Sequence, residues 1–212
     1  DQHYQITLFQ LDVLVETDLY TAVFTNVGAR LKSIRLKNYA LTADSDSPRV
    51  SVVNVDNPRS ATLRLEGRNG LQFDSEAVYK IISSSTAVSL SGQEQQQLVF
   101  RHTSSDGLVV DKIFLLDAAS YAIGLDVKID NGSVKPLQGV LELSLVKQWT
   151  DADKPSESMV FAGTATYINE SVEQVEVDDI VKESPSYGSN AIWTGFEDKY
   201  FMSVLVPHDP FD

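Results

Sequence analysis

Apolar and polar residues alternate along much of this chain, and residues 121–129 show the pattern most clearly. Every second side chain there is apolar and falls on one face of an extended strand: Tyr121, Ile123, Leu125, Val127 and Ile129. The residues between them fall on the other face: Ala122, Gly124, Asp126 and Lys128. The segment is therefore predicted to be a half-buried β-strand.

The same alternation recurs in four further segments: Leu11, Val13 and Val15; Tyr20, Ala22 and Phe24; Leu63 and Leu65; and Leu141, Leu143 and Leu145. Residues that tolerate positive φ lie between such segments, at 26–28, 68–70, 105–107 and 130–133. Short strands joined by tight turns predict antiparallel sheets.

Two fully apolar runs, at 113–116 and 204–206, predict strands covered on both faces, as in the centre of a two-layer sandwich. No long segment keeps the i, i+3, i+4, i+7 spacing of an amphipathic helix. The polar stretches 42–49, 92–97 and 150–158 are predicted to be solvated loops, because strand patterning resumes after each. We predict an all-β fold of antiparallel sheets with little helix, in a single domain over residues 1–212.

Composition narrows the function further. The 212 residues include no cysteine, and 17 Lys and Arg stand against 30 Asp and Glu, for a net charge of -13. These values exclude a disulfide scaffold and thiol chemistry, and they disfavour binding to nucleic acid or to anionic lipid. No stretch approaches the roughly 20 apolar residues of a membrane helix, and the first residues are polar, so neither a membrane span nor a signal peptide is predicted.

Candidate catalytic and metal-binding groups are few. The three histidines, His3, His102 and His208, are isolated from one another and from carboxylates at metal-ligand spacing, so no metal site is predicted. No Gly-x-Ser-x-Gly elbow and no phosphate-binding glycine loop is present. We therefore assign no catalytic residue, no cofactor-binding residue and no metal ligand.

Carboxylates gather in one stretch of the chain: Glu173, Glu176, Asp178, Asp179 and Glu183. Apolar residues interleave with them: Val172, Val175, Val177, Ile180 and Val181. An acid/base pair would need one carboxyl group in an apolar pocket. The favoured interpretation is an amphipathic edge strand whose charged face is in water. The spacing at Asp178 and Asp179 does not match a calcium-binding loop.

Four aromatic residues cluster near the C-terminal end: Trp193, Phe196, Tyr200 and Phe201. The favoured interpretation is a core cluster, since aromatic side chains bury large areas. Removing the Tyr200 ring would then cost about 3 to 5 kcal/mol of stability. The alternative is a surface that binds a ligand or partner.

At this cluster the sequence resembles a known family. Trp193-Thr-Gly195-Phe-Glu-Asp-Lys199-Tyr200-Phe201, followed by Val204-Leu-Val-Pro207, is similar to the Trp-x-Gly-x-x-Asp-Lys-Tyr-Phe…Pro signature of the large periplasmic domain of YidC-type bacterial membrane protein insertases. Other blocks resemble that family in the same order: 15–24, 28–39, 107–114, 121–131 and Phe161-Ala-Gly163 with Tyr167. The resemblance spans nearly the whole chain.

The resemblance implies a β-supersandwich related to galactose-mutarotase-like domains. It implies a periplasmic domain of a Gram-negative inner-membrane protein, tethered through flanking transmembrane helices that are absent from this chain. The implied role is a non-catalytic accessory domain, largely dispensable for insertion itself, that aids membrane protein insertion and folding through contacts with Sec components (SecD/SecF, SecYEG) or nascent membrane proteins. The family's domain continues beyond the Lys-Tyr-Phe block, so this chain is expected to be a short version or a fragment truncated at its C-terminal end.

Two other functions remain open. The supersandwich fold is shared with sugar-binding and aldose-epimerase-like domains, whose chemistry needs an acid and a base across a sugar ring; His102 is the candidate in mid-chain. A groove between sheets could instead bind an extended peptide, with Trp149 as a candidate contact, although a core role for this side chain is favoured.

Overall fold

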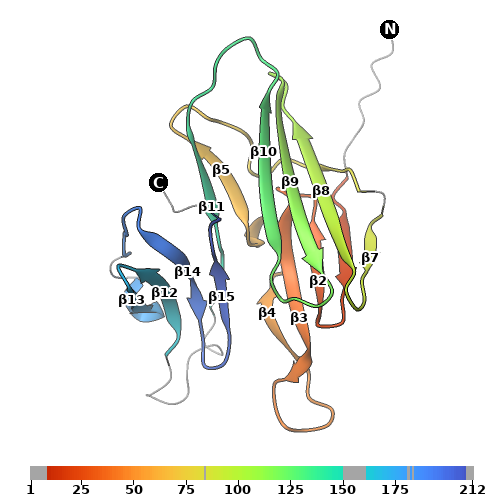
Figure 1. Cartoon of the computed structure of the whole chain (residues 1–212), viewed down its shortest axis with the longest axis vertical. Helices are drawn as coiled ribbons and strands as arrows, with labels where there is room; N and C mark the ends of the chain where they lie inside the picture. Colours follow the sequence, from red (N-terminus) through yellow and green to blue (C-terminus); the bar gives the residue numbers. More distant parts are fainter. Residues whose placement is uncertain (1–8, 84, 150–160, 181, 183, 209–212) are drawn as a thin grey trace. The chain divides into compact units, whose positions relative to one another are not determined.

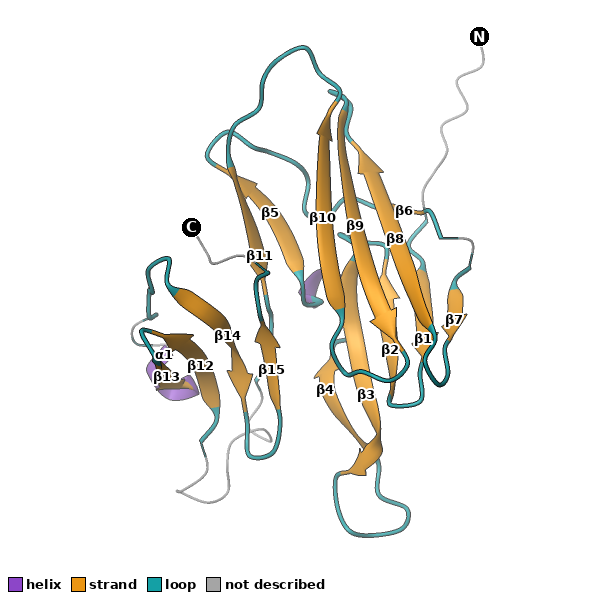
Figure 2. Ribbon diagram, in the orientation of Figure 1, coloured by secondary structure: helices purple, strands orange, loops and turns teal. Residues whose placement is uncertain are grey.

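The computed structural model describes residues 9–83, 85–149, 161–180, 182 and 184–208 (Figure 1). The chain divides into two compact units, an N-terminal unit of Asp1–Val146 and a C-terminal unit of Lys147–Asp212. Within the described residues, nearly all of the regular secondary structure in each unit is β-strand (Figure 2). The prediction of an all-β fold is confirmed, whereas the single domain over residues 1–212 stays a prediction.

The first sheet of the N-terminal unit has the strand order β4-β3-β2-β1-β7. Its strands are β1 (Asp12–Glu16), β2 (Tyr20–Thr25), β3 (Arg30–Ala40), β4 (Arg49–Asn54) and β7 (Ala87–Ser89). Neighbours pair antiparallel except β1 and β7, which run parallel with Val15 opposite Val88. A parallel pair needs a long crossover, which the sequence analysis did not predict.

The second sheet has the order β10-β9-β8-β6 and is antiparallel throughout. Its strands are β6 (Lys80–Ile81), β8 (Gln95–Thr103), β9 (Leu108–Asp117) and β10 (Gly124–Asn131). A two-stranded ribbon pairs β5 (Arg64–Arg68) with β11 (Val140–Ser144), and a short 3-10 helix covers Pro58–Ser60.

The core of the N-terminal unit lies between its two sheets. Phe24 of β2 and Phe114 of β9 meet with ring centroids 4.7 Å apart, and Phe100 of β8 packs edge-on against Phe114 at 5.9 Å. All three rings are fully buried, as are Val13 and Val15 of β1. Side chains from both sheets therefore interdigitate, as in a β-sandwich.

The C-terminal unit is one antiparallel sheet of order β13-β12-β14-β15. Its elements are β12 (Gly163–Ile168), β13 (Ser171–Glu176), β14 (Ala191–Glu197), β15 (Met202–Leu205) and a single helical turn α1 (Val177–Ile180). The described residues contain no helix that is long and apolar enough to span a membrane.

Several strand predictions hold, and others need correction. The alternation predicted over 121–129 is observed from Gly124, where β10 begins, and residues 121–123 lie outside the strand. The apolar residues of β10 are only half-buried because β10 is an edge strand. In the apolar run 113–116, Leu115 points outward and is exposed, while the other three side chains are buried. The prediction for 204–206 is wrong: β15 is the outermost strand of its sheet, and Val204 and Val206 are exposed.

Of the three predicted loops, one is observed over most of its length, one only in part, and one lies outside the described residues. Of the predicted loop 42–49, residues 42–48 lie in the connection between β3 and β4, and Arg49 already begins β4. In contrast, β8 already begins at Gln95, so only the first part of the predicted loop 92–97 is a turn. The predicted loop at 150–158 lies outside the described residues.

Candidate functional site

Lys112 lies on the inward face of β9, in the core of the N-terminal unit. Because side chains alternate along a strand, it shares this face with Val110 and Phe114. Its Nζ is fully buried and donates hydrogen bonds to the carbonyl oxygens of Gly28 at 3.2 Å and Leu63 at 2.7 Å. The same nitrogen lies 5.7 Å from the centroid of the Phe114 ring. Two carbonyls and an aromatic face thus replace water around this amine.

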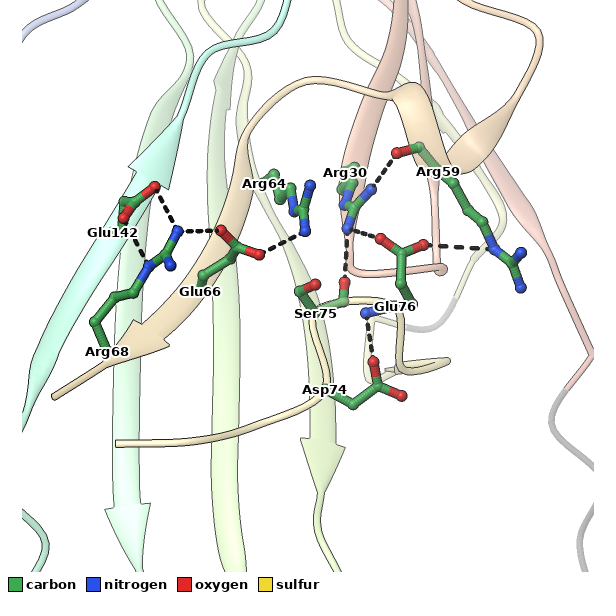
Figure 3. Close-up of polar contacts among 9 residues, drawn as sticks. All are labelled: Arg30, Arg59, Arg64, Glu66, Arg68, Asp74, Ser75, Glu76 and Glu142. Atoms are coloured by element: carbon green, nitrogen blue, oxygen red, sulfur yellow. Dashed lines mark hydrogen bonds and ion pairs between the residues drawn. The ribbon is translucent and has the colours of Figure 1, made fainter. Parts of the chain in front are cut away.

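Arg30, the first residue of β3, is a second fully buried cation. Its Nη1 donates to the Arg59 carbonyl at 2.7 Å, and its Nη2 donates to the Ser75 carbonyl at 2.8 Å and to the Glu76 carboxylate at 2.5 Å (Figure 3). Glu76 also lies 3.6 Å from Nε of Arg59. One carboxylate and two carbonyls therefore compensate this buried charge, and removing any of them would leave it partly unpaired.

The backbone at and beside the two carbonyls that Lys112 binds is left-handed. Gly28 has φ 66°, Ala29 has φ 47° and Leu63 has φ 62°. A Cβ on Gly28 would lie 2.5 Å from the Ser75 carbonyl oxygen, so only glycine fits there. Lys112 binds the carbonyls of both Gly28 and Leu63, and it therefore ties two strained segments to β9.

A charged row lies beside this cluster on the ribbon of β5 and β11. Arg68 donates from Nε to the Glu142 carboxylate at 2.9 Å, across the pair of strands, and Glu66 accepts from both Arg64 and Arg68 (Figure 3). Hydrogen bonding to Glu142 raises the pKa of the exposed Arg68. Exposed pairs of this kind stabilise a fold little, so this row supports the β5–β11 register more than the core.

The electrostatics of the cluster favour a structural role over catalysis. Burial, with a smaller contribution from the Arg30 charge, lowers the pKa of Lys112 to about 7. Such a pKa suits a catalytic amine, but Lys112 is sealed from solvent and its hydrogen bonds go to backbone carbonyls. The carboxylates nearby, Glu66 and Glu76, are both held by arginines. The arrangement can hold backbone segments together.

One face of the C-terminal sheet carries a second group of notable side chains. Tyr167 of β12 and Trp193 of β14 lie opposite each other, with rings stacked at 6.1 Å between centroids and 12° between planes. On the same sheet, the amide of Gln174 donates to the Glu197 carboxylate at 2.8 Å, from β13 across to β14. Opposite partners share a face, so these rings and Glu197 belong to one surface.

Comparison with known proteins decides the family. Residues 12–211 match the family described as the YidC periplasmic domain. The chain belongs to the YidC periplasmic domain family. This assignment confirms the family that the sequence resembles and the predicted periplasmic location.

Curated relatives agree with the assignment. The chain is 34% identical over 200 residues to the membrane protein insertase YidC of Pelobacter propionicus, 32% over 195 residues to that of Geotalea uraniireducens, and 30% over 198 residues to that of Geobacter sulfurreducens. These alignments cover 94%, 92% and 92% of the chain but 36% of each relative. The chain thus spans about a third of the length of the relatives it matches.

The histidines of this YidC periplasmic domain are dispersed. His102 lies in β8, and its ring sits against the ring of Tyr79 at 5.4 Å between centroids. His208 is exposed near the end of the chain, and His3 lies outside the described residues. Among the residues with a described position, no group of three or more His, Asp or Glu is placed to hold a metal ion.

The predicted carboxylate stretch lies at the edge of the C-terminal sheet, but only its first part forms a strand. β13 is the outer strand of its sheet and its carboxylates are exposed, as predicted. The strand ends at Glu176, however, and residues 177–180 form the turn α1, so the predicted strand is too long. Asp179 pairs with Lys182 at 2.6 Å, and Glu183 lies outside the described residues.

The structure separates the four clustered aromatics. Tyr200 is 75% exposed, so the prediction that it belongs to a core is wrong. It lies in the turn between β14 and β15, which is closed by a hydrogen bond from the Asp198 amide to the Phe201 carbonyl. Trp193, Phe196 and Phe201 are half-buried. Trp149 is half-buried too, with Lys147 Nζ 4.3 Å from its ring centroid.

The buried positions of Arg30 and Lys112 were not predicted from the sequence. A signal for Lys112 is present: the apolar positions of β9 repeat every second residue, and Lys112 falls in phase with Val110 and Phe114. No comparable signal marks Arg30, since its partners Arg59, Ser75 and Glu76 lie 29 to 46 residues away along the chain.

Proposed function

We propose that this chain is a non-catalytic accessory domain of a membrane protein insertase, and that it contributes to insertion and folding through contacts with Sec components or with nascent membrane proteins. The observation that carries the proposal is the match to the YidC periplasmic domain over residues 12–211, together with relatives named as membrane protein insertases. The remaining two thirds of such relatives, which this chain does not cover, would supply the insertion machinery and the membrane anchor.

The geometry supports a role without chemistry. The most buried ionisable groups, Arg30 and Lys112, bind backbone carbonyls and Glu76. His102 packs against an aromatic ring, which is not the arrangement that an aldose epimerase needs for its acid and base. We expect mutarotation of common aldoses at neutral pH to proceed at the buffer rate in the presence of the protein. A rate that rises with protein concentration would contradict this part of the proposal.

The accessory role is tested in the full-length protein. The coding region for residues 1–212 is replaced by a short Gly/Ser linker, and the variant is expressed in cells depleted of their own insertase. Protease protection of a reporter membrane protein measures insertion, and affinity purification measures recovery of SecD and SecF. We expect insertion to be largely retained and recovery of SecD and SecF to fall. Unchanged insertion, reporter folding and Sec recovery would show that the domain makes no such contribution.

A further inference from the structure

The sheet of the C-terminal unit presents an apolar surface on the side of the stacked rings, here called the Trp193 face. By alternation along β14, Trp193, Gly195 and Glu197 share this face. Their neighbours on β15 are Val204, opposite Gly195, and Met202, opposite Glu197. At the other edge of the same face, Val172 of β13 lies opposite Tyr167. The Trp193 face is therefore formed by Tyr167, Trp193, Gly195, Glu197, Met202 and Val204, together with Val172, Gln174 and Glu176 of β13.

This face is mostly apolar, and its outer strands are accessible. Val172 is 49% exposed, Met202 is 49% exposed and Val204 is 37% exposed, while the two stacked rings are half-buried. Ala165 and Gly195, which face each other across β12 and β14, are buried at the centre of the face, and the polar Gln174 of β13 lies beside Ala165. Exposed apolar surface of this kind on a folded unit is a candidate binding surface, whereas scattered single residues are not.

Acidic groups lie at one end of the Trp193 face. Glu176 and Glu197 lie at opposite sides of Gly163 and so share the face with Met202. Glu197 accepts a hydrogen bond from Gln174, and the charge of Glu176 contributes to raising the pKa of Lys182, whose ion pair is with Asp179. Residues 147–212 contain 13 Asp and Glu against 4 Lys and Arg, so this unit carries -9 of the total charge of -13.

We propose that the Trp193 face binds an extended apolar peptide segment that carries Lys or Arg at one end. The apolar side chains of the peptide lie against Trp193 and Val204, and its cation lies beside Glu176 and Glu197. A second copy of this chain fits poorly, because two units of charge -9 repel each other. An anionic lipid surface is disfavoured for the same reason.

This inference rests on the proposed function and names its substrate class. Membrane proteins consist of apolar segments flanked by Lys and Arg, which is the chemistry that the Trp193 face complements. The apolar contact supplies affinity, and the carboxylates fix the direction in which the segment lies, since rim charges add specificity more than affinity.

The test is a binding titration with the 212-residue chain. The probe is a fluorescein-labelled synthetic peptide of five Leu and Val residues followed by three Lys, and fluorescence anisotropy gives its Kd. We expect Val204→Asp to raise the Kd by about tenfold or more, because an apolar contact is replaced by a charge. The double variant Glu176→Gln/Glu197→Gln should weaken it about three- to tenfold and reduce its dependence on salt.

Two matched controls make the same chemical changes elsewhere. Val134→Asp places a carboxylate at a fully exposed valine in the N-terminal unit, and Glu173→Gln removes a charge from the opposite face of β13. Both should leave the Kd within about twofold of the starting protein. Thermal melting confirms that each variant is folded, and the isosteric Glu-to-Gln variant provides the test if Val204→Asp does not fold.

The outcomes separate this inference from the proposed function. Selective weakening by the face variants supports the site. No binding by the unaltered chain, equal weakening by the controls, or equal affinity for a peptide with Glu in place of Lys overturns it. None of these results bears on the deletion experiment in the full-length protein, so the accessory role stands or falls on that measurement.

Discussion

The stability of the N-terminal unit should rise with pH above neutrality because of one residue, Lys112. Its pKa is lowered to about 7 in the folded protein, against about 10.4 in an unfolded chain. Between these values the unfolded state binds a proton that the folded state lacks, so the free energy of unfolding increases with pH. Below about pH 7 both states are protonated and the burial cost is fully present.

The magnitude follows from the pH range between the folded and unfolded pKa values of Lys112. Each pH unit within this range adds up to about 1.36 kcal/mol to the free energy of unfolding. Burial raises the pKa of Tyr20 to about 12 and that of Tyr79 as well, so their ionisation in the unfolded state opposes the effect above pH 10. Between pH 7 and pH 9.5, where the tyrosines contribute little, the free energy of unfolding is predicted to increase by about 3 kcal/mol.

Urea denaturation at the two pH values measures this gain. Far-UV circular dichroism follows both units, whereas both tryptophans, Trp149 and Trp193, lie in the C-terminal unit, so their emission identifies its transition. Lys112→Met keeps the side-chain length and removes the titrating group, so the gain should vanish. Lys128→Met, an exposed change on neighbouring β10, should retain it. A gain that persists in Lys112→Met would refute this reasoning.

Three further predictions concern stability and use urea denaturation. Arg30→Met should lower the free energy of unfolding by about 3 to 5 kcal/mol, because it leaves the Glu76 carboxylate and the Arg59 and Ser75 carbonyls without their cation. Arg59→Ala, which removes an exposed side chain, should lower it by less than about 1 kcal/mol. Equal losses in the two variants would contradict this prediction. Tyr200→Ala should cost less than about 0.5 kcal/mol, and a loss of several kcal/mol would restore the core interpretation. Gly28→Ala should lower the free energy of unfolding by more than about 1 kcal/mol, because Gly28 has a left-handed φ and the new Cβ would meet the Ser75 carbonyl. Gly188→Ala should leave it nearly unchanged, because there is open space around Gly188.

Alternation predicted the strands because it depends only on neighbouring residues. Leu125, Val127 and Ile129 share a face in β10 as the sequence indicates, and the turn at Gly28 lies where a positive φ was expected. The parallel pairing of β1 with β7 could not be predicted, since it joins segments more than 70 residues apart and leaves no local pattern.

The degree of burial was harder to predict than the strands themselves. Val204 belongs to an apolar run, but it is exposed because β15 is the last strand of its sheet, and strand order is not encoded in periodicity. Tyr200 is exposed because a turn positions it. For Lys112, in contrast, burial could have been predicted, because it lies in the same alternation as the apolar residues Val110 and Phe114.

The coding sequence on either side of residues 1 and 212 tests the central claim most directly. Hydropathy is scored over windows of about 20 residues in both flanks. An insertase domain predicts one apolar helix upstream and several downstream, in keeping with relatives of which this chain covers 36%. An open reading frame with no apolar segment of that length on either side would contradict the account.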